Sequence, residues 1–155
     1  MRRVFRRAAP VLAALCAGLA GPHAPACELR VAAARGGDTL QTIALPPSRE
    51  LVLAYLHSVT RTLVRETLTA DAGGLVQQRI EFSVPGPGLP TEALPGERFE
   101  RLPDHFVYDH MQRRIGVLTM RVDPAQAQTL QAGGSTHALT RWGATALQLS
   151  THDCD

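Results

Sequence analysis

Two side chains capable of chemistry, His57 and Glu66, lie in the stretch Leu53–Glu66 (LAYLHSVTRTLVRE). His57 and Glu66 fall at positions where the alternating pattern predicts apolar residues. A histidine held by a carboxylate serves as a general base or as a ligand contact. Ser58 follows His57 directly, so in a strand the two side chains point to opposite faces. That placement argues against a Ser-His nucleophile pair.

Two strands joined by a tight loop must position these groups. The pattern predicts strands over residues 50–58 and 63–70, with a loop over residues 59–62. In that register Tyr55 lies opposite Glu66, and His57 lies diagonal to Glu66 on the same, mostly apolar face. The chain therefore places a polar cluster at the loop end of this hairpin.

A carboxylate on a largely buried face is costly unless it is paired or hydrogen-bonded. The sequence offers four partners for Glu66: His57, the Tyr55 hydroxyl, Arg61 and Arg65. One interpretation is a histidine and carboxylate at a pocket mouth. The other, which we favour, is a structural pair that pins the hairpin loop to the sheet.

The rest of the chain also has strand character. Residues 75–83 alternate and follow an Asp-Ala-Gly-Gly turn, whereas residues 85–103 hold five prolines and cannot form a central strand. Further strands are predicted over residues 29–34, 41–45, 113–123, 137–139 and 144–151. Short strands separated by turn signals predict an all-β protein, a small antiparallel β-sandwich or partly open barrel.

Few residues outside the cluster suggest a reaction. Asp104, His105, Asp109 and His110 are of metal-binding type, but they show no recognised ligand spacing. The chain has no G-x-S-x-G, P-loop, H-E-x-x-H or dinucleotide-binding fingerprint. We therefore predict no metal and no cofactor, and we favour a protein that is not an enzyme.

The first residues have the order of a secretory signal peptide. A cationic start, MRRVFRR, precedes an apolar run and an Ala-Pro-Ala site before Cys27. We predict a signal peptide over residues 1–26 and one exported, periplasmic domain over residues 27–155. Arg2 and Arg3 leave general secretory and twin-arginine export both open. A lipid anchor on Cys27 is a weaker alternative, because the preceding residues fit that signal poorly.

Cysteine content and charge support this assignment. Cys27 and Cys154 remain after cleavage, and an even count in an oxidising compartment predicts a disulfide between them. A redox or metal thiol beside His152 is the alternative. Removing the four leader arginines leaves 12 basic residues against 14 acidic ones, which changes the formal charge from +2 to about −2. A nucleic-acid partner therefore loses the basic surface that it would need.

Two motifs about 20 residues apart resemble the bacterial and archaeal domain-of-unknown-function family 1850. Its members typically carry His-Ser-Val-x-(Arg/Lys)-Thr-x-Val-x-Glu and then a strand that leads into Gly-x-Gly-Leu-Pro. The matching residues here are His57, Ser58, Val59, Arg61, Thr62, Val64 and Glu66, followed by Gly86, Gly88, Leu89 and Pro90. Val84-Pro85 departs from the family's usual approach to the glycine loop.

The resemblance implies a partner, because genes of this family often lie beside those of TRAP-type transporters of the TAXI class. It therefore implies an exported accessory domain that binds a transporter subunit or solute-binding protein. From strand order we expect the glycine loop to emerge at the same sheet end as His57, with Arg61 and Glu66 beside it. The alternatives are a small-molecule-binding domain or hydrolase that uses His57 and Glu66, and a structural envelope domain.

Overall fold

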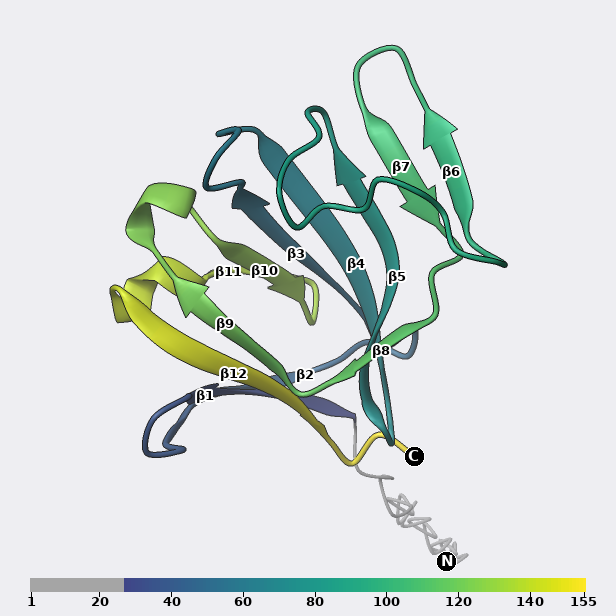
Figure 1. Ribbon diagram of the computed structural model, residues 1–155. Helices are drawn as coiled ribbons and strands as arrows, with labels where there is room; N and C mark the ends of the chain where they lie inside the picture. Colours follow the sequence, from purple (N-terminus) through teal and green to yellow (C-terminus); the bar gives the residue numbers. More distant parts are fainter. Residues whose placement is uncertain (1–26) are drawn as a thin grey trace, which may run out of the picture.

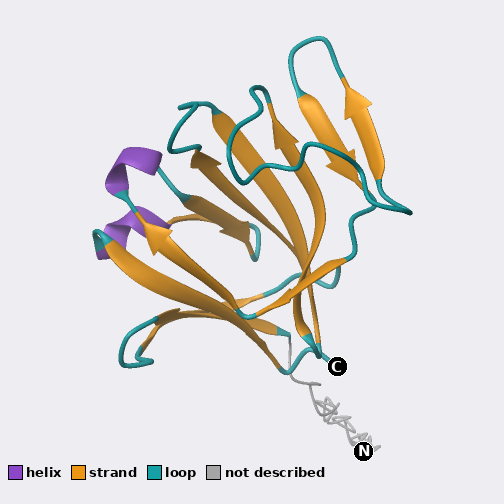
Figure 2. Ribbon diagram, viewed as in Figure 1, coloured by secondary structure: helices purple, strands orange, loops and turns teal. Residues whose placement is uncertain are grey.

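Two antiparallel sheets form the fold in the computed structural model, which describes residues 27–155 (Figures 1 and 2). The predicted signal peptide lies outside the described residues. The smaller sheet has the strand order β2 (Thr39–Ala44), β1 (Glu28–Ala33), β12 (Thr145–His152) and β9 (Leu118–Val122). Its first hairpin, β1 with β2, was predicted from the sequence and is confirmed.

The larger sheet carries both motifs and extends beyond the smaller one. Its order is β11 (Ser135–Ala138), β10 (Thr129–Ala132), β3 (Glu50–Leu56), β4 (Leu63–Asp71), β5 (Gly74–Phe82), β7 (Phe106–Asp109) and β6 (Arg98–Arg101). A further strand, β8 (Arg113–Gly116), pairs with the start of β5. Two 3₁₀ turns, η1 (Pro124–Gln126) and η2 (Leu139–Trp142), complete the elements. The predicted all-β class is confirmed, and the antiparallel sheets do not close into a barrel.

The prediction of one strand over residues 113–123 is wrong. The chain breaks at Gly116, whose φ of 71° is in the left-handed region, and β8 and β9 join different sheets (Figure 1). Gly74 permits the crossing, because a Cβ there would lie 2.5 Å from the Gly116 carbonyl oxygen. Apolar and polar residues do alternate along this segment, but the alternation gives no sign that the chain passes from one sheet to the other.

Short strands were also missed. The segment around Asp109, expected to be irregular, contains β7, and β6 lies within the proline-rich region as an edge strand. The strand expected at residues 137–139 is the second half of a hairpin, β10 with β11. Strands of four residues carry too little alternation to be recognised from the sequence.

Two clusters of buried side chains make up the core. The first lies between the sheets and includes Leu29, Leu51, Leu68 and Leu149. The second covers the other half of the large sheet. Its members are Val64, Ile80, Phe82, Leu89, Tyr108 and Met111. Tyr55 packs against both clusters, so it marks the boundary between them.

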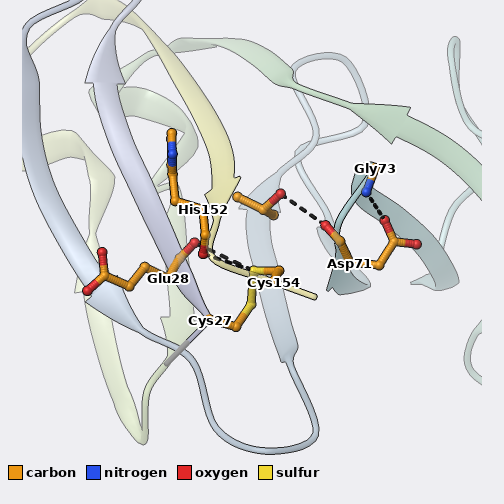
Figure 3. The surroundings of a disulfide bond; sticks show 7 residues. Cys27, Glu28, Asp71, Gly73, His152 and Cys154 are labelled. Carbon is orange, nitrogen blue, oxygen red and sulfur yellow. Dashed lines mark hydrogen bonds between the residues drawn. A yellow bond between two sulfur atoms is a disulfide. The ribbon is translucent and has the colours of Figure 1, made fainter. Parts of the chain in front are cut away.

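A disulfide joins the two ends of the described chain, as the cysteine count predicted (Figure 3). Cys27 precedes β1 and Cys154 follows β12, two strands that are direct neighbours. Both cysteines are buried, and their Cα atoms lie 4.3 Å apart. In the chain-entropy account, closing so long a loop stabilises the folded chain by up to about 5 kcal/mol. Because the bond occupies both sulfur atoms, the free-thiol alternative beside His152 does not apply.

Candidate functional site: the β3–β4 hairpin and the glycine loop

The register of the β3–β4 hairpin differs by two residues from the predicted one. Glu66 lies opposite Leu53, and Tyr55 lies opposite Val64. The loop therefore runs over residues 57–62, two residues longer than expected. A shift of two keeps every side chain on its predicted face, so the apolar face was predicted correctly. The predicted diagonal contact of His57 with Glu66 is not formed, and the two side chains bind different partners.

His57 is a buried structural centre of its loop, with 7% of its surface exposed. Its Nδ1 accepts hydrogen bonds from the backbone N–H groups of Val59 and Thr60, at 3.2 Å each. Because Nδ1 accepts, the proton of the neutral ring is on Nε2, which donates to the Pro87 carbonyl at 3.0 Å. The ring thus fixes its own loop and also ties that loop to the glycine loop.

The contact with Pro87 brings together the two motifs that are distant in sequence. Gly86 lies against the ring: a Cβ at this position would be 2.9 Å from His57 Cε1 and 3.0 Å from Thr60 Cγ2. A side chain at residue 86 would therefore force the loops apart. The expected meeting of the His57 loop and the glycine loop at one sheet end is found.

The other motif residues of the glycine loop fold it onto the sheet. Gly88 has a φ of 84°, a conformation that favours glycine. The loop closes with a hydrogen bond from Leu89 N–H to the Gly86 carbonyl, and Leu89 is buried in the second core cluster. Pro90 follows, half-buried. Leu89 thus covers a part of the sheet that the smaller sheet does not reach.

The remaining motif residues of the first loop face outward or serve the turn. Ser58 is exposed, and no hydrogen bond to His57 is formed. Arg61 has a φ of 57° and donates to the Ala125 carbonyl in η1 at 2.8 Å, not to Glu66. The hydroxyl of Thr62 lies 2.9 Å from that of Thr60.

Glu66 forms a separate cluster at the boundary between the two cores. Its Oε1 accepts from the Tyr55 hydroxyl at 2.7 Å, which is one of the predicted partners. Its Oε2 accepts from Gln77 Nε2 at 2.7 Å. Burial, the charge of Glu66 and this hydrogen bond all raise the pKa of Tyr55 far above its usual value, so the hydroxyl remains a donor.

Gln77 was missed because of a β-bulge. The β4–β5 register shifts between Thr67 and Leu68, so Leu68 lies opposite Gln77 and Gln78 has no partner in β4. The bulge reverses the alternation in the first half of β5. The uninterrupted alternation predicted for residues 75–83, which would put Leu75, Gln77, Arg79 and Glu81 on one face, is therefore wrong. Gln77 instead shares the inner face with Glu66.

The residues of metal-binding type are dispersed. Asp104 and His105 bond to each other in the β6–β7 turn, Asp109 bonds to Arg79, and His110 is exposed. Among residues 27–155, no group of three or more His, Cys, Asp or Glu side chains is placed to hold a metal ion.

The inner-face geometry provides bracing contacts. Both ring nitrogens of His57 and both carboxylate oxygens of Glu66 have protein partners. A proton transfer by the His57 ring would require one of its bonds to break. Within the described part of the chain, no helix is long and apolar enough to cross a membrane.

Comparison with known proteins places the chain in a family. A model described as "Domain of unknown function (DUF1850)" matches residues 51–139, which span both motifs and the elements that carry them. No curated protein and no solved structure matches the chain. The match covers more than half of the sequence and agrees with the resemblance seen in the motifs. The chain is a member of the DUF1850 family.

Proposed function

We propose that this protein is an exported accessory domain that binds a component of a TRAP-type transporter, either a membrane subunit or the solute-binding protein. The contact surface is the loop edge, defined as residues 57–63 together with residues 83–90. Its role is binding rather than catalysis.

The observation that carries the proposal is a set of exposed apolar side chains on these fixed loops. Val59 is 66% exposed, Leu63 is 45% exposed and Val84 is 42% exposed. They flank a His57 ring that holds both loops in place. A single exposed apolar residue needs no explanation, but several at one rigid end of a sheet are typical of a protein-binding surface. Little conformational entropy is lost when such pre-ordered loops bind.

The predicted export supports the same function. The leader has the order of a secretory signal, and a cysteine pair placed for a disulfide is typical of oxidising compartments. A periplasmic domain meets both the solute-binding protein and the outer loops of a transporter. The gene neighbourhood implied by the family resemblance favours this class of partner.

The test is binding to purified TRAP transporter subunits and solute-binding protein from the same organism. Val59→Glu should weaken binding at least tenfold, because it places a charge at the centre of an apolar contact. Val117→Glu is the matched control, since Val117 is 54% exposed and lies in the β8–β9 connection. Absence of binding by the unmutated protein, or equal loss in both variants, would refute the proposal.

A further inference from the structure

The outer face of the large sheet aligns polar residues in rows across three strands. The β5–β7 ladder ends at the pair Phe82 and Phe106, and Ser83 and His105 are the residues just beyond that end. The β4–β5 ladder pairs Val64 with Phe82, so Leu63 continues the same row. Side chains that are cross-strand neighbours lie about 5 Å apart. Leu63, Ser83 and His105 each lie just beyond the end of a ladder, and all three line one hollow.

A hollow of about 280 Å³ lies on these residues. Arg65 and Glu81, a direct pair in the β4–β5 ladder, form the adjacent row, and Asp104 lines the hollow from the β6–β7 turn. Its volume is at the lower limit for ligand pockets, which suits a molecule of only a few heavy atoms.

The two acidic groups of the hollow already have partners. Glu81 binds Arg79, which also reaches Asp109 at 3.3 Å. Asp104 Oδ1 lies 2.8 Å from His105 Nδ1, and this bond lowers the pKa of the Asp104 carboxyl below its usual value. The proton on His105 Nδ1 is therefore directed at Asp104, and Nε2 is the ring atom left to a ligand.

Three hydrogen-bonding groups remain for a ligand. Among the described residues Arg65 forms no salt bridge, although it lies directly opposite Glu81. Ser83 is exposed, and its hydroxyl can donate or accept. His105 offers Nε2, which donates when the ring is protonated. Leu63, 45% exposed, supplies an apolar wall beside them.

We infer that this hollow binds a small organic monocarboxylate. The ligand's carboxylate pairs with the Arg65 guanidinium, whose planar fork matches a carboxylate. The Ser83 hydroxyl and the protonated His105 ring donate to the carboxylate oxygens, and the ligand's short apolar chain lies on Leu63. Inorganic phosphate is the poorer ligand, because Glu81 and Asp104 repel a dianion more strongly than a monoanion and phosphate has no apolar part. The inference does not depend on the proposed transporter partner.

Butyrate, inorganic phosphate and butanol are the probes, titrated separately into isotope-labelled protein purified after expression of the full chain. Butyrate should move the backbone amide signals of Ser83 and His105 along a saturating curve. Phosphate and butanol should produce weak, non-saturating changes. Arg65→Gln should raise the butyrate Kd about tenfold or more, as expected when a charge-assisted hydrogen bond is lost.

Arg121→Gln is the matched control, because Arg121 is also exposed on a strand and lines a different hollow with Arg35 on the smaller sheet. Its butyrate Kd should not change. The amide spectrum of each variant reports whether the fold is retained. Non-saturating butyrate shifts, an unchanged Kd in Arg65→Gln, or phosphate binding as tight as butyrate would each overturn the inference. None of these outcomes affects the transporter-binding assay, which is done without carboxylates.

Discussion

Replacement of Glu66 by glutamine should destabilise the protein, because the carboxylate braces the boundary between the two cores. The change keeps the shape of the side chain and removes its charge. Hydrogen bonds to a charged group contribute about 1 kcal/mol more than neutral ones, and Glu66 accepts two, from Tyr55 and Gln77. We expect Glu66→Gln to lower the free energy of unfolding by about 2 kcal/mol at neutral pH.

The assay is chemical and thermal unfolding of the disulfide-bonded protein. For a domain of this size, a loss of about 2 kcal/mol corresponds to a Tm lower by roughly 8 °C. Glu50→Gln is the matched control. Glu50 is exposed at the start of β3, so its replacement should change stability by no more than about 0.5 kcal/mol.

A double-mutant cycle that combines Glu66→Gln with Tyr55→Phe measures the interaction energy between these two side chains. If the Tyr55 hydroxyl acts through Glu66, the two losses should be non-additive by about 1 kcal/mol. An unchanged or raised Tm for Glu66→Gln would refute the bracing role. It would mean that the charge is retained at a cost to stability, as happens at functional sites. Glu66 would then be the first inner-face residue to test for binding.

Three further predictions concern the loops and the chain ends. Gly86→Ala should lower the free energy of unfolding by about 1–3 kcal/mol, because its Cβ overlaps the His57 ring. In a His57→Ala background most of that loss should disappear. A loss of equal size with and without the His57 ring would contradict the close contact. Cys154→Ser should lower the free energy of unfolding by up to about 5 kcal/mol. The reduced unmutated protein should have the same Tm as Cys154→Ser. If the variant kept the Tm of the disulfide-bonded protein, the disulfide would contribute nothing to stability. The hydrogen bond from Arg114 lowers the pKa of Asp71 to about 2, so the stability that this carboxylate contributes is present above pH 3.8 and is lost as pH falls toward 2. The unfolding midpoint of Asp71→Asn should therefore change less between pH 3.8 and pH 2 than the midpoint of the unmutated protein. Parallel curves of midpoint against pH would contradict this prediction.

Local pattern was enough to predict most strands but not their alignment. The face of β3 and β4 that carries Tyr55 and Glu66 was predicted correctly, since a register shift of two preserves it. The shift itself arises because His57 and Ser58 belong to the loop, where the His57 ring accepts hydrogen bonds from two backbone N–H groups. The alternation of apolar and polar residues cannot predict a hydrogen bond between a side chain and the backbone of its own loop.

Other parts of the site depended on tertiary structure. The bulge at Gln78 decides that Gln77, not its neighbour, reaches Glu66, and the sequence of β5 alternates as if no bulge were present. The row that contains Ser83 and His105 requires β7 beside β5, and β7 is too short to predict. The disulfide was predictable because only two of the cysteines lie outside the predicted leader.

Three residues of the two family motifs, His57, Glu66 and Leu89, build the inside of the molecule. His57 ties one loop to another, Leu89 covers the second core cluster and Glu66 braces the boundary between the cores. Their side chains are engaged by protein partners, so these residues explain why the fold forms and leave little chemistry for a ligand. Groups that can meet another molecule are Val59 and Val84 on the exposed side of the loop edge and Arg65 on the outer face. Substitutions at these outward positions should therefore alter binding while stability is retained, and inner-face substitutions should alter stability first.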